Sequence, residues 1–567
     1  MILSEYVHRQ LSAHDVEVAF GIPGYFVMPI WQEFKKSPRI VLSRHESGAA
    51  FMADGYSRAT GRLGVVLATS GPGMTNCVTG VACAYRDSLP MLVITGQAPT
   101  ASFGRGAFLE SYVLDRAVSP AALFAPITKK SIEVVDSANA AFLIATAIDL
   151  ALSGRPGPVH LSIPVDLQSQ DIPVPDGVER ASTTLPVAPG ALRDTAELLA
   201  GAQRPLLLVG WGVPRAGVGA DVARLAEEIG APVVTTTKAI SALAADDPLL
   251  ACHLGPGQRS DAPAFVRDYR PDVVVALGAS MSSYYAEPVL PVFEGATLVR
   301  ADVDADQLRL RVRPDIALHG DLAVIAPALS DAVAQAQRSA PPPHAAARSE
   351  HARAVVARFR DRGRRAAEVQ PHDHDGAPSM SGTIARLADL LPRDAVVLPD
   401  AGNHWLDTLS LHHSPVADGL QLNCGIGAMG WAIGAAVGMA FGRPDRRTVC
   451  VTGDGSLLMH GTELSVAAEH GLDLLVIVFN NRSHARVRIN QAMAFDGDVV
   501  GSDVPDLRLH RWLAEMGLRT FVVERPEDVE DVLREAIATP GTVGVEVRCS
   551  PDEAPASLRA WIDGVAP

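Results

Sequence analysis

Two polar motifs, each at the end of an apolar run, constrain the fold of this chain more than any other feature. The apolar residues 448–451 lead into the sequence TGDGS at 452–456, and the apolar residues 474–479 end at the asparagine pair 480–481. A helical pattern over 457–470 separates the two runs. This order predicts a βαβ unit, in which two parallel strands present their carboxyl ends at the same edge of one sheet.

The polar groups at this edge are suited to a metal ion and a diphosphate. Asp454 offers a carboxylate and Asn481 an amide oxygen, and Mg²⁺ prefers such oxygen ligands, which it usually shares with phosphates. The helix that opens at Gly455 and Ser456 points backbone N–H groups at the same place, which favours an anion. The simpler alternative is a glycine turn and an asparagine turn in an ordinary α/β domain.

Length, charge and composition limit the possible classes of protein. A chain of 567 residues is too long for one core and suggests about three or four domains, which 48% hydrophobic residues can fill. The net charge of −15 argues against a nucleic-acid or anionic-membrane partner. The six cysteines contain no C-x-x-C pair, and no basic region followed by an apolar core begins the chain. We therefore expect a cytoplasmic protein without a signal peptide.

One uncharged segment, residues 419–442, is long enough to span a bilayer. It contains Gln421, Asn423 and seven glycines, and it runs directly into the GDG unit. These features favour a buried, glycine-rich helix over a membrane span.

Alternating helical and β-branched segments divide the chain into three blocks. We expect domains at 1–168, 190–336 and 381–567, joined by proline-rich and alanine/arginine-rich connectors. Strands that alternate with helices throughout predict the α/β class, here with three doubly wound parallel-sheet domains.

The C-terminal motif resembles the thiamine diphosphate-binding motif, in which GDG is followed at a fixed distance by NN. The resemblance implies that Asp454, Asn481 and the backbone carbonyl of Ser483 hold Mg²⁺ on the cofactor diphosphate. It also implies cofactor contacts from Gly453, Gly455, Ser456 and His484.

The N-terminal block resembles the same superfamily. FGIPG at 20–24 matches its F-G-x-P-G segment, and GPGMTN at 71–76 matches its G-P-G-x-x-N turn. By this resemblance Pro72 and Asn76 contact the cofactor. The match extends over nearly the whole chain and is closest to the acetolactate synthase / benzaldehyde lyase branch.

Glu46 follows the expected strand 40–42 and begins a helix. From the residues alone, an acidic side chain at this place can simply favour the helix dipole. In thiamine enzymes a glutamate here bonds N1′ of the aminopyrimidine and promotes the imino tautomer, which removes the C2 proton of the thiazolium. The resemblance therefore implies that Glu46 is catalytic, with burial adjusting its proton affinity.

The same resemblance gives each block a role. It implies a pyrimidine-binding domain at 1–168, a central domain at 190–336 and a diphosphate-binding domain at 381–567. It also implies a homo-oligomer whose active sites lie between subunits, with Glu46 from one and Asp454 from the other.

Two further motifs of the third block match the family. By resemblance Gly402, Asn403 and His404 approach the diphosphate. The Gly427 carbonyl would accept a hydrogen bond from the 4′-amino group, and Met429 would hold the cofactor in its bent shape. Core filling is the alternative for Met429.

The substrate pocket departs from the family patterns. Val487 stands where pyruvate decarboxylases have a catalytic glutamate, and acetolactate synthases have an apolar residue there. Their G-A-F-Q-E stretch reads GAFLE at 106–110, with leucine in place of glutamine. The candidate pocket residues are Tyr25, Phe108, Leu109, His484, Arg486 and Val487.

Flavin is not expected. Some acetolactate synthases hold FAD on the central domain with an R-F-D-D-R segment, but here residues 279–284 read ASMSSY. The sequence GWG at 210–212 is only a weak indication of a dinucleotide.

Together these observations predict a thiamine diphosphate- and Mg²⁺-dependent carboligase. It would decarboxylate a 2-oxo acid and transfer the acyl carbanion to a second carbonyl compound. The alternatives are a 2-oxo-acid decarboxylase without ligation, an acyloin lyase, a dinucleotide-dependent oxidoreductase and a non-catalytic protein with the thiamine fold. The oxidoreductase would leave Glu46 and the asparagine pair unexplained.

Overall fold

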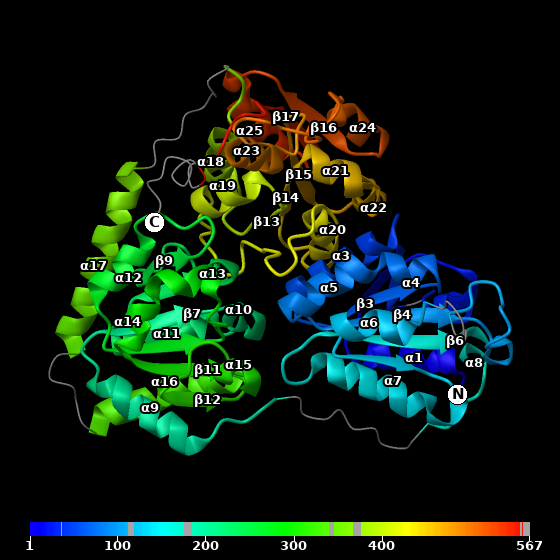
Figure 1. The fold of residues 1–567 in the computed structure, drawn as a ribbon, viewed down its shortest axis with the longest axis horizontal. Coiled ribbons are helices and arrows are strands. Elements are labelled where there is room, and N and C mark those ends of the chain that lie inside the picture. Colours follow the sequence, from blue (N-terminus) through cyan, green and yellow to red (C-terminus); the bar gives the residue numbers. More distant parts are fainter. Residues whose placement is uncertain are drawn as a thin grey trace.

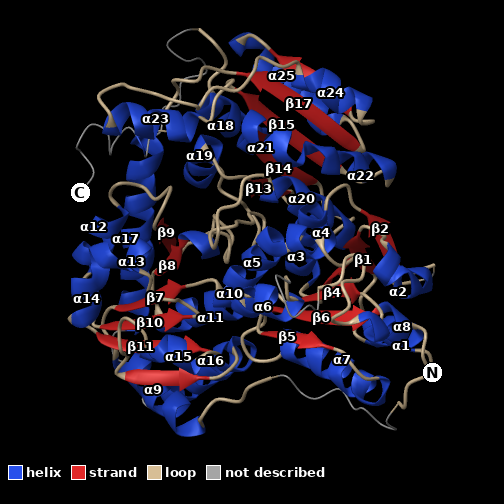
Figure 2. Cartoon of the chain, turned by 45° about the vertical axis from the view of Figure 1, so that its right-hand side comes forward, coloured by secondary structure: helices blue, strands red, loops and turns tan. Residues whose placement is uncertain are grey.

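The three sheets of the chain lie at the corners of a triangle (Figure 1). This computed structural model describes residues 1–35, 37–111, 118–174, 184–339, 345–366, 376–555 and 558. The N-terminal sheet lies at the lower right of Figure 1, the central sheet at the lower left and the C-terminal sheet at the top. Each sheet is covered by helices on both faces (Figure 2), so the predicted α/β class with three parallel sheets is confirmed.

The N-terminal sheet has six strands in the order β2-β1-β3-β4-β6-β5, all paired in parallel. Its strands are β1 (Val18–Gly21), β2 (Arg39–Leu42), β3 (Gly64–Ala68), β4 (Met91–Gln97), β5 (Lys130–Glu133) and β6 (Pro158–Pro164). Its helices include α1 (Leu3–Ala13), α2 (Met28–Glu33), α3 (Glu46–Thr60), α4 (Pro72–Asn76), α5 (Val78–Asp87), α6 (Pro120–Phe124), α7 (Ser137–Leu152) and α8 (Val165–Gln168).

The central sheet is also parallel, in the order β12-β11-β10-β7-β8-β9. Its strands are β7 (Pro205–Val209), β8 (Val233–Thr236), β9 (Leu250–Leu254), β10 (Val273–Leu277), β11 (Thr297–Asp302) and β12 (Ile316–His319). Its longer helices are α9 (Pro189–Gly201), α11 (Gly219–Ile229), α12 (Ala262–Tyr269), α16 (Leu322–Ser339) and α17 (Ala345–Ala366). Helix α17 runs along the outer edge of this domain toward the C-terminal sheet (Figure 1).

The C-terminal sheet has five parallel strands in the order β13-β14-β15-β17-β16. They are β13 (Val396–Pro399), β14 (Thr448–Gly453), β15 (Leu474–Asn480), β16 (Arg519–Val523) and β17 (Thr542–Arg548). The single helix expected between β14 and β15 is interrupted. The segments are α21 (Asp454–His460), the 3₁₀ turn η6 (Gly461–Glu463) and α22 (Leu464–Glu469). The other helices are α18 (Met380–Leu390), α19 (Asn403–Leu411), α20 (Trp431–Gly442), α23 (Ala485–Ala494), α24 (Leu509–Glu515) and α25 (Val529–Ala538).

The glycine-rich segment that ends in α20 packs the C-terminal domain against the N-terminal domain. Helix α20 lies along α3, and the two helices share one hydrophobic core. A Cβ atom on Gly438 would lie 1.9 Å from the Met52 carbonyl oxygen, and one on Gly55 would lie 1.9 Å from that of Ala435. Glycine is needed on both helices because their backbones touch. Among the described residues, no helix is long and apolar enough to cross a membrane.

Arg58 of α3 lies where the three domains meet, and its side chain is 0% exposed. The guanidinium donates to Asp54 Oδ1 at 2.7 Å, Asp87 Oδ2 at 2.5 Å and the Leu422 carbonyl at 3.0 Å. Its charge also lies over Trp211 of the central domain and Trp431 of the C-terminal domain.

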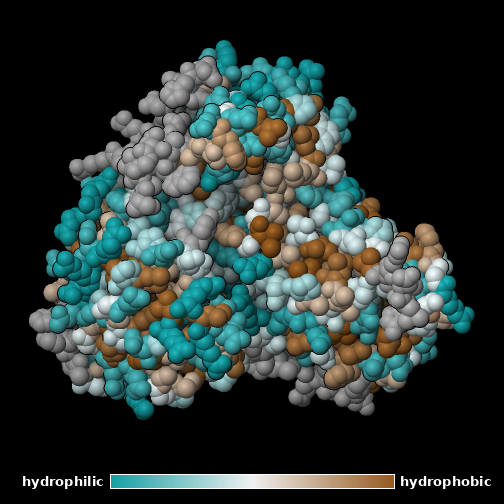
Figure 3. Space-filling model, in the orientation of Figure 1, coloured by the Kyte–Doolittle hydropathy of each residue, from teal (hydrophilic) through white to brown (hydrophobic). Residues whose placement is uncertain are grey.

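On the face in Figure 3, hydrophobic residues gather on the side of the N-terminal domain that faces the middle of the molecule.

Candidate active site

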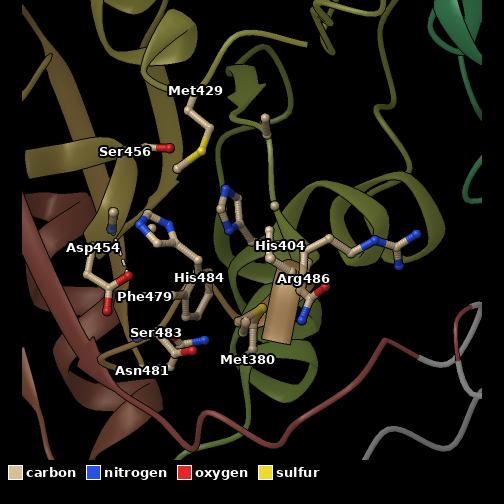
Figure 4. A pocket seen from close by; sticks show the side chains of 17 residues that line it. Met380, His404, Met429, Asp454, Ser456, Phe479, Asn481, Ser483, His484 and Arg486 are labelled. Carbon is tan, nitrogen blue, oxygen red and sulfur yellow. Dashed lines mark hydrogen bonds between the residues drawn. The ribbon is translucent and has the colours of Figure 1, made fainter. Parts of the chain in front are cut away.

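A pocket opens at the carboxyl ends of the C-terminal strands (Figure 4), with an empty volume of about 490 Å³ that includes its opening to solvent. Most of the candidates from the third block line it: Gly402, Asn403, His404, Met429, Gly453, Asp454, Gly455, Ser456, Asn481, Ser483, His484, Arg486 and Val487. Four residues that the sequence did not single out also line the pocket, namely Met380, Ala401, Phe479 and Ala485. These four are small or apolar residues that carry no motif of their own.

Asp454 and Asn481 are brought together by the pairing of β14 with β15. Because Gly453 is in register with Phe479, both strands end at the same level of the sheet. The Asp454 carboxylate accepts from the Gly455 N–H at 2.7 Å and from the Arg482 N–H at 2.6 Å. Burial raises the pKa of Asp454, and these N–H groups act in the opposite direction. A cation beside the carboxylate would offset that cost of burial.

Asn481 belongs to the same turn. Its Oδ1 accepts from the Ser483 N–H at 3.2 Å, so the turn folds back and places Ser483 in the pocket wall. The side chains of both residues are buried. Asn481 and Ser483 thus line the same pocket as the Asp454 carboxylate, and oxygen atoms of these residue types suit Mg²⁺.

His404 of α19 faces the pocket from the other side. Burial lowers its pKa to about 4, so the ring is neutral at pH 7. Its buried Nε2 has no hydrogen-bond partner among the described residues. A buried polar atom without a partner is unusual in a folded protein, and a bound phosphate oxygen would satisfy it.

Two glycines keep the pocket open. A Cβ atom on Gly402 would lie 2.4 Å from His404 Cε1, and one on Gly455 would lie 2.5 Å from His484 Cε1. Gly455 is in the first turn of α21, where backbone N–H groups point out of the helix. The space, the helix terminus and the oxygen ligands fit a diphosphate with its metal ion.

Asp400 has a structural role that the sequence analysis did not assign. It is completely buried, and its carboxylate accepts from the Gly430 N–H at 2.8 Å and from Thr452 Oγ1 at 3.0 Å. Burial raises the pKa of Asp400 to about 6. These bonds fix the turn next to Met429 against the end of β14. An acidic residue two positions after the apolar run 396–398 was the available signal.

The candidates from the N-terminal domain form a second group, and none of them lines this pocket. Glu46 is 9% exposed, and its Oε2 accepts from Asn76 Nδ2 at 2.9 Å. Pro72 begins α4, and Leu109 lies close to the neighbouring Gly71. One candidate of the C-terminal domain, Gly427, also lies outside the pocket, and it adopts a positive φ of 70°.

Three of the expected substrate residues are exposed in the single chain. Tyr25 is 65% exposed, Phe108 79% and Val487 51%. Tyr25 and Phe108 belong to the N-terminal domain, whereas Arg486 and Val487 line the C-terminal pocket. One chain thus presents two separate groups of candidate residues.

Comparisons with known proteins cover all three domains. The family models for thiamine pyrophosphate enzymes match as the N-terminal TPP binding domain over residues 1–115, the central domain over 192–329 and the C-terminal TPP binding domain over 400–547. A solved structure of a candidate thiamin diphosphate-dependent enzyme from Mycobacterium smegmatis superimposes with a TM-score of 0.79. It covers 97% of this chain and 100% of its own, and at 24% identity it shows the fold alone.

Curated relatives are similar over almost their whole length. Acetolactate synthase isozyme 2 large subunit of Escherichia coli is 32% identical over 94% of this chain and 92% of its own. Acetolactate synthase isozyme 1 large subunit of the same organism is 30% identical over 97% of this chain and 94% of its own. An acetolactate synthase of Arthrospira platensis is 31% identical over 96% and 93%.

These matches place a thiamine cofactor on this fold. The TPP binding domains at both ends of the chain contain the two groups of candidate residues described above. The protein is thus an enzyme that uses thiamine diphosphate to form or cleave C–C bonds. The chain belongs to the thiamine pyrophosphate enzyme family, in its acetolactate synthase branch.

Proposed function

We propose that this enzyme is a Mg²⁺-dependent carboligase that decarboxylates a 2-oxo acid and transfers the acyl group to a second carbonyl compound. The observation that carries the proposal is the pocket in which Asp454, Asn481 and Ser483 adjoin the first turn of α21. When bound there, thiamine diphosphate supplies the nucleophilic carbon and the electron sink that this chemistry needs.

The residues of the pocket have distinct tasks in this proposal. Asp454, Asn481 and the Ser483 carbonyl hold Mg²⁺. His404 donates from Nε2 to the diphosphate, because its neutral ring and its lack of another partner leave that atom available. Further cofactor contacts come from Gly402, Asn403, Met429, Gly453, Gly455, Ser456 and His484.

The metal ligands can be tested by replacing Asp454. Asp454→Ala leaves Asn481 and Ser483 in place but removes the only carboxylate of the proposed ligand set. We expect calorimetry to show loss of thiamine diphosphate binding at millimolar Mg²⁺, and chelator treatment of the wild type to release the cofactor. Wild-type affinity in Asp454→Ala would refute the assignment.

Glu46 handles a proton in this proposal. Its carboxylate would bond N1′ of the aminopyrimidine, and the hydrogen bond from Asn76 holds that carboxylate in place. Glu46 is in a different domain from Asp454, and none of the described residues of the N-terminal domain lines the pocket. We infer that a second copy of the chain supplies Glu46, so the working form is a homo-oligomer with sites between subunits.

Ligation rather than aldehyde release is favoured by the residues around Val487. The Val487 side chain has no acidic group that could protonate the carbon from which CO₂ has left. General acid–base catalysis changes a rate by about 10²–10⁴-fold. Arg486 also lines the pocket and can hold a carboxylate of the donor or acceptor. The acyl group should therefore persist until a second carbonyl compound accepts it.

A substrate panel tests this function. Purified enzyme would be given 2-oxo acids with and without aldehyde or 2-oxo-acid acceptors, with CO₂ release measured and products identified by mass spectrometry. We expect ligated products to exceed free aldehyde when an acceptor is present. Arg486→Ala should lower the activity toward charged substrates more than the activity toward neutral ones. Free aldehyde alone across the panel would favour the plain decarboxylase.

The central domain offers a physical reason to expect no flavin. Its switch point lies between β7 and β10, where α/β sheets bind nucleotides. Here a Cβ atom on Gly210 would lie 2.2 Å from the Gly278 carbonyl oxygen, and the Gly212 N–H donates to that carbonyl at 3.1 Å. The turns that follow β7 and β10 therefore contact each other through their backbones at this switch point. We expect a colourless protein, and a stoichiometric flavin absorption band would contradict this.

A further inference from the structure

Glu463 connects the C-terminal domain to the segment that carries Glu46. Glu463 ends the 3₁₀ turn η6 and is fully buried. Its Oε1 accepts from the His45 N–H at 2.8 Å, and its Oε2 accepts from the Arg44 N–H at 3.0 Å. Arg44 and His45 are the last two residues before α3, whose first residue is Glu46. Both carboxylate oxygens therefore bond the backbone immediately before Glu46.

The fit between the two elements is close. A Cβ atom on Gly48 would lie 2.1 Å from Glu463 Oε1, and its three nearest atoms would all belong to Glu463. A side chain at position 48 would displace the carboxylate, because Glu463 occupies the space that a Cβ atom would take. The first turn of α3 is therefore shaped around Glu463.

A second contact joins Arg44 to α22, near the surface. The Arg44 side chain donates from Nε to Ser465 Oγ at 2.8 Å and pairs with Glu469 at 2.6 Å. Glu469 is 56% exposed, so this ion pair contributes little to stability. It offers a matched control, because it also joins Arg44 to the C-terminal domain but does not bond the backbone before Glu46.

Burial and neighbouring groups act on the pKa of Glu463 in opposite directions. Burial raises the pKa of Glu463 to about 7, the Arg44 and His45 N–H groups and the Arg44 charge lower it, and the Glu46 charge raises it. An ionised carboxylate can accept from both N–H groups, whereas a neutral amide of the same shape has only one oxygen acceptor. Glutamine therefore removes one of the two bonds and keeps the volume.

We propose that Glu463 is a positioning residue that holds the Glu46 carboxylate in the position from which it can bond the aminopyrimidine ring. This rests on the proposed function, in which Glu46 drives removal of the C2 proton. Glu463 is not among the residues that line the cofactor pocket, and both of its carboxylate oxygens bond the backbone immediately before Glu46. Its loss should impair proton removal and leave diphosphate and metal binding intact.

The test measures exchange of the C2 proton of enzyme-bound thiamine diphosphate by NMR, together with cofactor affinity by calorimetry. A displacement near 1 Å at a reacting group can cost about 100-fold, so we expect Glu463→Gln to slow exchange by about 10- to 100-fold. Cofactor affinity should stay within about threefold. Amide hydrogen exchange of Arg44 and His45 should increase, and Glu469→Gln should match the wild type in all three measurements.

Two further variants keep the result interpretable. Gly48→Ala displaces the same carboxylate without removing its charge, so it should also slow C2 exchange. It replaces Glu463→Gln as the test if that variant does not fold. In Glu46→Gln/Glu463→Gln, exchange should be no slower than in Glu46→Gln alone, because Glu463 acts through Glu46. Additive losses in the double variant would overturn the inference.

The remaining outcomes separate this inference from the proposed function. Unchanged C2 exchange in Glu463→Gln and Gly48→Ala, alongside a large loss in Glu46→Gln, would overturn the positioning role alone. Unchanged exchange in Glu46→Gln would overturn the proposed role of Glu46, and the role of Glu463 with it.

Discussion

His160 lies in the middle of β6, with its ring stacked on Phe124 at 4.1 Å between centroids. Its two ring nitrogens are each 2.8 Å from a hydroxyl, those of Thr95 and Ser131. A neutral ring can donate to one hydroxyl and accept from the other. Burial lowers the pKa of His160 to about 3, so the folded protein keeps this ring neutral at pH values where the unfolded chain takes up a proton.

This burial predicts a pH-dependent contribution to stability. The folded pKa lies below the unfolded value of about 6.5, so stabilisation by His160 is complete above pH 6.5 and falls as the pH decreases toward 3. The slope is at most about 1.4 kcal/mol per pH unit. We expect the advantage of wild type over His160→Gln, measured by urea unfolding, to shrink by about 2 kcal/mol between pH 7.5 and 5. A constant difference would contradict the assignment.

At the scale of elements, the sequence was most informative where a motif and a pattern coincide. The apolar runs 448–451 and 474–479 become the adjacent strands β14 and β15, as the motif at their ends predicted. The interruption at η6 was not predicted, because Gly461 and Thr462 alone do not distinguish a break from a continuous helix. The break matters because it turns Glu463 toward Arg44 and His45.

Contacts between distant segments account for most of what the sequence could not predict. The bonds from Glu463 to Arg44 and from Asp400 to Gly430 depend on how domains and loops pack. No local periodicity or spacing encodes such pairs. The roles of the individual site residues, Glu46 and Asp454 included, remain predictions.

The contact between α3 and α20 predicts an unusual response to a small substitution. Alanine is favoured over glycine inside a helix by about 1 kcal/mol, yet a Cβ atom on Gly438 would lie 1.9 Å from the Met52 carbonyl oxygen. Overpacking of this kind costs about 1–3 kcal/mol. We expect Gly438→Ala to lower the Tm by calorimetry. Gly201→Ala in α9, where nothing lies within 4 Å, should leave the Tm equal or higher.

At the scale of the whole molecule, Arg58 holds the three domains together through buried charges. Asp54 and Asp87 come from the N-terminal domain, Lys238 of the central domain also pairs with Asp87, and the Trp431 Nε1–H donates to Asp54 at 3.1 Å. The side chains of Arg58, Asp54 and Asp87 are 0% exposed. Removing the guanidinium would leave the buried Asp54 without its cationic partner and would leave Asp87 with Lys238 alone.

We therefore expect Arg58→Met to destabilise the protein by about 3–5 kcal/mol, as for other broken buried ion pairs. Tryptophan fluorescence should shift to the red at a lower temperature than in wild type, because Trp211 and Trp431 flank the lost charge. Arg62→Met is the control. Its pair with Glu17 is 40% and 64% exposed, so the loss should be about 0–1 kcal/mol. Equal losses of unfolding free energy in Arg58→Met and Arg62→Met would show that the buried junction stabilises the protein no more than an exposed ion pair does.

The two separate groups of candidate residues lead to a prediction about assembly. If each active site takes Glu46 from one subunit and Asp454 from its partner, a dimer of one Glu46→Gln chain and one Asp454→Ala chain has one intact site and one doubly defective site. If both residues act within one chain, both sites of that dimer are defective. The symmetry of a two-fold dimer makes these outcomes exclusive.

The experiment co-expresses the two variants with different affinity tags and purifies the mixed dimer over both columns. We expect the mixed dimer to recover about half of the wild-type activity per dimer, since one of its two equivalent sites is intact. Each variant purified alone should remain inactive, which excludes residual activity of either chain. Tyr25 and Phe108, exposed in the single chain, should become protected from labelling or solvent exchange in the dimer. A mixed dimer as inactive as its parents would place Glu46 and Asp454 in the same chain's site and refute the shared arrangement.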